Sequence, residues 1–225
     1  SEPVEGSQMS ARDDILAKVR AGIGRKPGTD RGPRPVPAPI PARGQVEGEA
    51  RLVLFTKQAE AVAATVVRIP DMAALPAAVS NYLAGQNLPA AIMATADTDF
   101  DTVPWNTQAM LEITRGTPGI ADQVCLAQAA AGIAETGSLV MTANADNPHM
   151  ASFVPETAVV VLRASRIEGT LDDAMARLRV TGDLPRAVSL ISGPSRTGDI
   201  ALKIELGAHG PRRVHIVIVD EPEAA

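Results

Sequence analysis

The run Thr-Ala-Val-Val-Val-Leu at residues 157–162 limits the fold of this chain more than any other feature. A strand that is apolar at almost every position must be covered on both faces, as happens in parallel sheets flanked by helices. Similar runs alternate with segments of helical periodicity along the chain. The expected strands are 64–69, 90–94, 132–142 (one or two strands around Gly137), 187–191 and 214–219, and the expected helices are 45–63, 71–84, 120–131, 171–180 and 199–206. The sequence therefore predicts an α/β fold, with a mainly parallel sheet and helices on both faces.

The composition restricts both the core and the partners. Apolar residues make up 45% of the chain, but the aromatic residues are one Trp, one Tyr and three Phe, so aliphatic side chains must fill the core. The formal charge of −5 and the thin spread of Lys and Arg argue against a nucleic-acid partner. No apolar stretch approaches the ~20 residues of a membrane span, and no signal-peptide pattern opens the chain. We therefore expect a cytoplasmic protein without a membrane span.

Cys125 is the one cysteine of the sequence. A single thiol excludes a disulfide framework and a self-contained iron–sulfur cluster, which needs about four thiolate ligands. We place Cys125 in the helix expected at 120–131, as a buried packing residue. Because His149, His209 and His215 show no ligand spacing with one another or with Cys125, no metal site is expected.

The first part of the chain differs from the rest. Ser10 and Asp13 fit a capping box, and apolar residues follow at helical spacing. Six prolines then exclude a helix or a central strand and favour an extended arm. We divide the chain into an extension or tag remnant (1–8), an N-terminal amphipathic helix (9–24), a Pro-rich arm (25–44), the α/β domain (45–220) and a tail (221–225). The sequence leaves open whether the first helix docks on its own domain or on a partner.

The segment Ser-Gly-Pro-Ser-Arg-Thr-Gly-Asp-Ile at 192–200 is the densest candidate for a binding site. It lies between an expected strand and an expected helix, where open α/β sheets usually bind ligands. Backbone N–H groups at a helix start, small hydroxyls and an arginine together suit a carboxylate or a phosphate. A tight turn with Ser195 or Thr197 as helix N-cap explains the same residues. The candidate ligand-binding residues here are Ser192, Gly193, Ser195, Arg196, Thr197 and Asp199.

Two other turns carry candidate catalytic residues. In Ala-Glu-Thr-Gly-Ser at 134–138, Glu135 could act as a base or a nucleophile, with Thr136 and Gly137 as ligand-binding neighbours. The alternative is a hairpin turn in which this glutamate faces water. In Gly-Ala-His-Gly-Pro at 207–211, His209 is a catalytic candidate and Gly210 a ligand-binding one, or the histidine is exposed and structural.

These three motifs, in this order, resemble the LUD domain and, more closely, the lactate-utilization protein C family. The resemblance implies a fold related to the sugar-isomerase and coenzyme A-transferase type. It also implies a role in L-lactate utilization beside iron–sulfur proteins that carry the redox centres. Family members often carry a histidine where this chain has Ala158, so this chain either lacks the chemistry of that histidine or uses His149 instead. The residues at the motif positions are Glu135, Thr136, Ser195, Arg196, Thr197, Asp199 and His209.

The leading hypothesis is an accessory or ligand-binding subunit needed for the oxidation of lactate to pyruvate. It binds no cofactor itself, and the iron–sulfur clusters are expected in its partners. The alternative is an independent enzyme of the coenzyme A-transferase or cyclo-ligase type of fold that acts on a small anionic substrate. A regulator that senses an acid is a third interpretation, although no segment resembles a DNA-reading helix.

Overall fold

The computed structural model describes residues 10–24, 39, 41–180, 182, 185–198 and 205–220. The chain divides into two units, residues 1–39 and 40–225. In the first unit, helix α1 (Ala11–Gly22) begins after Ser10. The Ser10 hydroxyl accepts a hydrogen bond from the Asp13 N–H at 3.3 Å and donates one to the Asp13 carboxylate at 2.7 Å. The predicted helix and its cap are therefore confirmed.

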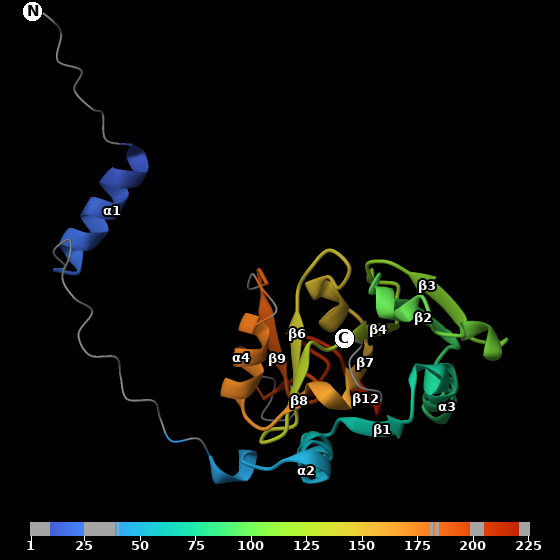
Figure 1. Cartoon of the computed structure of the whole chain (residues 1–225). Coiled ribbons are helices and arrows are strands. Elements are labelled where there is room, and N and C mark those ends of the chain that lie inside the picture. Colours follow the sequence, from blue (N-terminus) through green and yellow to red (C-terminus); the bar gives the residue numbers. More distant parts are fainter. Residues whose placement is uncertain are drawn as a thin grey trace, which may run out of the picture. The chain divides into compact units, whose positions relative to one another are not determined.

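Six parallel strands form the main sheet of the second unit, in the order β1-β12-β7-β4-β2-β3 (Figure 1). They are β1 (Thr65–Ile69), β2 (Ala91–Ala94), β3 (Glu112–Arg115), β4 (Val124–Gln128), β7 (Thr157–Arg163) and β12 (Arg213–Val219). The apolar run at 157–162 lies in β7, between β12 and β4, and it is buried throughout. This confirms the predicted parallel α/β sheet.

A second sheet of four strands packs beside the first. Its strands, in spatial order, are β8 (Ile167–Glu168), β5 (Ala131–Ile133), β6 (Ser138–Thr142) and β9 (Val188–Ile191). β6 pairs antiparallel with both β5 and β9. Helix α4 (Leu171–Val180) packs on this sheet through Ala174 and Leu178 and lies beside it in Figure 1. The sequence predicts strands on both sides of Gly137, but not that they leave the main sheet.

Helices cover both faces of the main sheet, as expected. α3 (Leu75–Gly85) packs on one face through Leu75, Val79 and Leu83. α2 (Gly48–Ala61) packs on the other face through Phe55 and Ala59, together with side chains of β6. The short 3₁₀ helices are η1 (Ala42–Gly44), η2 (Met72–Ala74), η3 (Thr98–Phe100), η4 (Trp105–Thr107), η5 (His149–Ser152) and η6 (Ala164–Arg166).

The helix expected at 120–131 is wrong, because this segment contains β4 and the start of β5. Cys125 therefore lies on a strand, although its expected burial is confirmed with 1% of its surface exposed. The residues around it are apolar at nearly every position, so periodicity does not separate a buried strand from a buried helix. Pairing with β2 and β7 decides for the strand, against the helical preference of the local alanines.

The helix expected at 199–206 is wrong at its end. Glu205–Leu206 forms strand β11, which pairs antiparallel with β10 (Arg196–Thr197). Residues 199–204 lie outside the described residues.

Strand β3, at the edge of the main sheet, was not expected, because alternating polar residues make Glu-Ile-Thr-Arg weakly apolar.

The folded domain begins before Gln45, where the sequence places its start. Gly44, assigned above to the arm, is buried, and a Cβ atom there would lie 2.7 Å from Thr170 Cγ2. The last turn of that arm is therefore packed against the start of α4.

Within the described ranges, no helix is both long and apolar enough to cross a membrane.

Candidate functional site

The structure brings two of the three motifs together through the pairing of β6 with β9. Ser138 Oγ lies 2.8 Å from Thr136 Oγ1 and 2.5 Å from Ser192 Oγ. Three hydroxyls, from motifs more than fifty positions apart, thus form one hydrogen-bonded chain. Hydroxyls that satisfy one another have fewer free lone pairs and protons for a ligand.

Gly137 and Gly193 hold the end of helix α2 in place. Both have positive φ angles, +65° and +69°, which favour glycine. A Cβ atom at Gly137 would lie 2.1 Å from the Ala59 nitrogen, and one at Gly193 would lie 2.1 Å from the Val62 carbonyl oxygen. Arg196 donates a hydrogen bond from Nη2 to this same carbonyl at 2.8 Å, where a positive charge suits the helix dipole. These residues of two motifs therefore pack against the carboxyl end of α2 and fix its position.

Ser195 and His209 meet in a second place. The Ser195 hydroxyl accepts a hydrogen bond from the His209 backbone N–H at 3.3 Å, and the Ser195 N–H donates to the Pro211 carbonyl at 2.8 Å. Gly210 packs beside them, with a virtual Cβ 3.4 Å from Ser195 Cβ. The two motifs are thus joined by one hydrogen bond to the Ser195 side chain and one between backbone groups.

His209 and Gly210 line a cavity of about 490 Å³. Its other lining residues are Ile120, Asp122, Gln123, Phe153, Val154, Pro155, Glu156, Gly207, Ala208 and Arg212. Gln123, Glu156 and Arg212 directly precede β4, β7 and β12, so the cavity lies at the amino ends of these strands. Open α/β sheets usually bind ligands at the opposite edge. Ligand binding at this cavity would depend on its own charged groups, among them Arg212 at 3.6 Å from the Glu156 carboxylate.

Glu135 lies in a third place, at the start of α4. Only 8% of its surface is exposed, and its Oε1 accepts a hydrogen bond from the Leu171 N–H at 3.2 Å. Its own N–H donates to the Gly169 carbonyl at 3.1 Å. The glutamate is therefore not a water-facing hairpin residue; it satisfies a free N–H group in the first turn of a helix.

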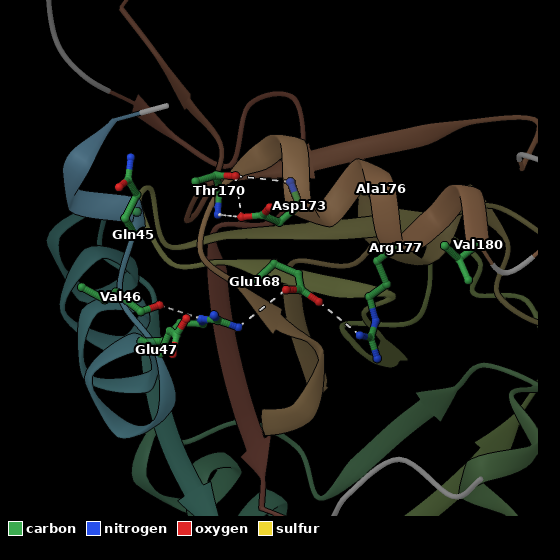
Figure 2. Close-up of a pocket in the computed structure, with 11 residues that line it drawn as sticks. Gln45, Val46, Glu47, Glu168, Thr170, Asp173, Ala176, Arg177 and Val180 are labelled. Atoms are coloured by element: carbon green, nitrogen blue, oxygen red, sulfur yellow. Dashed lines mark hydrogen bonds and ion pairs between the residues drawn. The ribbon is translucent and has the colours of Figure 1, made fainter. Parts of the chain in front are cut away.

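A cavity of about 950 Å³, larger than the one lined by His209, lies next to this helix (Figure 2). Its wall includes Glu168, which forms ion pairs with Arg177 at 3.1 Å and with Arg51 at 3.6 Å. Figure 2 shows Thr170 and Asp173 joined by hydrogen bonds at the start of α4. Both carboxylate oxygens of Glu168 are therefore already paired with arginines.

Replacement of Glu135 by alanine is expected to lower the free energy of unfolding by about 1–2 kcal/mol, because a helix-capping acceptor is lost. Glu135→Gln keeps a side-chain oxygen near the Leu171 N–H and should retain most of the stability. Urea denaturation of the two variants and the unchanged chain measures this difference. Equal stability of all three would show that the contact contributes nothing to the fold.

The remaining candidates are separate from these places. Thr197 is buried on β10 with 8% of its surface exposed, and Asp199 lies outside the described residues. Ala158 is buried on β7, paired with Cys125 and Val214. The helix amino terminus that the sequence predicts at residue 199 lies outside the described residues.

His149, the histidine that could substitute for one at Ala158, lies near the smaller cavity. Its ring centroid is 4.8 Å from that of Phe153, a lining residue, and its Nε2 lies 3.2 Å from Ser189 Oγ. Phe153, Glu156 and Arg212 also line this cavity, and none of them is a candidate from the sequence. Their positions just before the apolar runs of β7 and β12 are a signal that could have placed them at one edge of the sheet.

Within the described residues, no group of three His, Cys, Asp or Glu side chains could hold a metal ion.

The architecture defines an α/β protein with a six-stranded parallel sheet and a smaller mixed sheet, and comparisons with known proteins agree. Residues 120–219 match the LUD domain. A solved structure of a DUF162 family protein from Deinococcus radiodurans superimposes with a TM-score of 0.56 at 21% identity, over 76% of this chain and 97% of that one. At this identity the superposition shows the shared fold alone.

Sequence relatives extend the comparison. Lactate utilization protein C of Deinococcus radiodurans is 28% identical over 226 residues, which cover 95% of this chain and 97% of the relative. Lactate utilization protein C of Anoxybacillus flavithermus is 34% identical over 39% of this chain and 40% of its own length. An uncharacterized protein of Neisseria meningitidis is 33% identical over 51% of this chain, and the match spans 46% of that relative. Residues 120–219 are therefore similar to the LUD domain, and two of these relatives are lactate utilization protein C.

Proposed function

We propose that this protein acts in L-lactate utilization, as an accessory or ligand-binding subunit for the oxidation of lactate to pyruvate by iron–sulfur partner proteins. The observation that carries the proposal is the similarity to a lactate utilization protein C over 95% of this chain. The proposal also places the protein in the cytoplasm, where lactate and pyruvate are metabolised.

The chemistry of the single thiol supports an accessory role. Cys125 is buried on β4, and burial raises the pKa of its thiol to about 12. A protonated, buried thiol is a poor metal ligand, and an iron–sulfur cluster needs about four thiolates. We therefore propose that the electrons of lactate oxidation pass to clusters on the partner chains, with no cofactor held by this one.

For a small anionic ligand we favour the His209 cavity over the larger one. Every residue that lines the His209 cavity lies within 120–219, the region that matches the LUD domain. The larger cavity takes part of its wall from Gly44 to Arg51, outside that region. His209 and Arg212 provide donor groups on the wall of the smaller cavity.

The test is lactate-dependent reduction of an electron acceptor by the iron–sulfur partners, with and without the full chain. We expect turnover to rise sharply when the chain is added and to fall when Arg212→Gln replaces it. Arg179→Gln, on the far end of α4, serves as a matched control and should behave like the unchanged chain.

Two results would count against the proposal. Partners that oxidise lactate equally well alone, and that do not bind the chain in sedimentation, would remove the subunit role. Turnover of an anionic acyl or phosphoryl substrate by the isolated chain would instead favour an independent enzyme of the coenzyme A-transferase or cyclo-ligase type of fold.

A further inference from the structure

The carboxyl edge of the main sheet holds a polar cluster that lies apart from all three sequence motifs. After β2 the chain moves outward to the edge strand β3, whereas after β4 it moves the other way, to β7 and β12. β2 and β4 are nevertheless neighbours, so the strand order reverses between them. Such a reversal is where open α/β sheets form a ligand crevice, at the carboxyl ends of the strands.

Polar side chains end three of the strands around this point. Arg115 ends β3, Gln128 ends β4 and Arg163 ends β7. Each follows by two positions an apolar residue that packs on the α3 face, namely Ile113, Leu126 and Val161. Because side chains alternate along a strand, all three polar groups leave the sheet on that same face.

The turn η3, which follows β2, ties these side chains together through Asp99. One oxygen of the Asp99 carboxylate accepts hydrogen bonds from Gln128 Nε2 at 2.8 Å and from Arg163 Nη2 at 2.9 Å. Burial alone would raise the pKa of Asp99, but the hydrogen bonds from Arg163 and Gln128 hold it below its ordinary value. Asp99 is therefore an anion that fixes the orientation of both partners.

Arg115 is bound to the same turn from the β3 side. Its Nη2 donates to the Asp97 carbonyl at 2.7 Å and to the Asp101 carboxylate at 2.9 Å. The Asp99 N–H in turn donates to the Asp97 carboxylate at 3.0 Å. Desolvation raises the pKa of the Asp97 carboxyl. The carboxylates of Asp99 and Asp101 are thus paired with arginines, and the cluster is not an acidic site for a cation.

Two atoms of this cluster are buried without a hydrogen-bond partner among the described residues, Gln128 Oε1 and Arg115 Nη1. Asp99 requires the Gln128 nitrogen on its side, so the amide cannot flip to satisfy its oxygen. Gln128 is 5% exposed, and an unpaired acceptor buried so deeply costs on the order of 1–3 kcal/mol. Its oxygen needs a donor, and the arginine nitrogen needs an acceptor.

We infer that this edge of the sheet binds a small hydroxylated organic anion, whose hydroxyl donates to Gln128 Oε1 and whose carboxylate accepts from Arg115 Nη1. The anion supplies the donor and the acceptor that the cluster lacks. Among such anions, the choice of a 2-hydroxy acid rests on the proposed function. The binding site itself rests on Gln128, Arg115 and the Asp99 turn, and it is a second anion site, separate from the His209 cavity at the amino ends of the strands.

The experiment is a titration of the full ¹⁵N-labelled chain with L-lactate, followed through the side-chain amide signals of Gln128. Propionate, which has the same carboxylate and chain length but no hydroxyl, is the matched probe. We expect saturable shifts with L-lactate and binding at least about tenfold weaker with propionate, because the buried acceptor then stays unpaired.

Variants locate the site. Gln128→Met removes the acceptor and Arg115→Gln removes the cation, and each should weaken L-lactate binding by about ten- to a hundredfold. Arg68→Gln, at the end of β1 in an exposed pair with Asp220, is the control and should leave binding unchanged. If Gln128→Met fails to fold, the Arg115→Gln titration decides.

Three outcomes would overturn the inference: no saturable shift with L-lactate, equal binding of propionate, or an ordered water that alone satisfies Gln128 Oε1 in a crystal soaked with L-lactate. The partner assay above separates this failure from that of the proposed function. A chain that still stimulates the iron–sulfur partners, yet shows none of these shifts, keeps its accessory role and loses only this site.

Discussion

Replacement of Gly137 by alanine is expected to destabilise the domain by about 3 kcal/mol or more. The new Cβ atom would lie 2.1 Å from the Ala59 nitrogen and 2.6 Å from Ala59 Cα. The backbone of α2 cannot move aside as the tip of a flexible side chain can. The added methyl group would therefore displace the helix from the core. The positive φ angle of +65° adds strain for any residue with a Cβ atom.

A matched control separates the two causes. Gly48 also has a positive φ angle, +54°, but a Cβ atom there meets nothing within 4 Å. Gly48→Ala should therefore cost only the conformational strain, about 1 kcal/mol. Urea denaturation of both variants at neutral pH gives the two free energies. Equal losses of unfolding free energy would contradict the close packing of Gly137 against α2. A stable Gly137→Ala variant that no longer responds to a ligand would favour the sequence-based role of Gly137 in ligand binding.

Stability is expected to fall by up to about 3 kcal/mol as the pH drops from 6.5 to 4, through the single side chain of His215. This histidine lies on β12 with 5% of its surface exposed, and burial lowers its pKa from 6.5 to about 4. The unfolded chain takes up the proton first, near pH 6.5, and the folded chain only near pH 4. The stabilisation is thus complete above pH 6.5 and disappears across that window.

The surroundings of His215 explain why the proton is excluded. Its ring stacks on Tyr82 at 3.8 Å between centroids, and its Nδ1 lies 2.8 Å from Thr65 Oγ1. Its Nε2 is buried without a partner among the described residues, so a proton there would be unsolvated. Burial also raises the pKa of the stacked Tyr82, and the charge of Arg213 only partly opposes this rise.

His215→Phe keeps a ring against Tyr82 and removes the titration, which makes it the comparison for the pH effect. Carboxylates titrate in both proteins, so the quantity to measure is the difference between their pH-dependent losses of unfolding free energy. We expect the unchanged chain to lose about 2–3 kcal/mol more than the variant between pH 7 and 4. Parallel curves would show that this histidine protonates as readily when folded as when unfolded.

The three motifs illustrate what local sequence can predict about a site. Ser195 and His209 occupy motif positions in separate segments, and the structure joins them by a hydrogen bond, with His209 on the wall of a cavity. Glu135 also occupies a motif position, but its carboxylate caps α4. A sequence motif shows which residue types occur together along the chain. It does not show whether a side chain faces a ligand or another part of the backbone, because that depends on which elements pack against it.

The carboxyl-edge cluster illustrates the opposite case. Asp99, Gln128 and Arg163 lie in segments far apart in the sequence, and none of them belongs to a recognisable motif. Gln128 was hidden further by the wrong assignment of 120–131 as a helix, which removed the strand end that positions it. Only the strand order β7-β4-β2 brings these residues to one edge of the sheet.

The sequence by itself determined the class of the protein. The apolar run of β7, the alternation of strand and helix patterns and the aliphatic composition require a parallel sheet covered on both faces, since such a strand has no stable place elsewhere. The tertiary structure alone decided the second sheet, the use of Gly137 and Gly193 against α2, and the reversal of strand order at β2 and β4. These features depend on contacts between distant segments, whose free energies are set by packing and hydrogen bonding across the fold and leave no periodic trace in the local sequence.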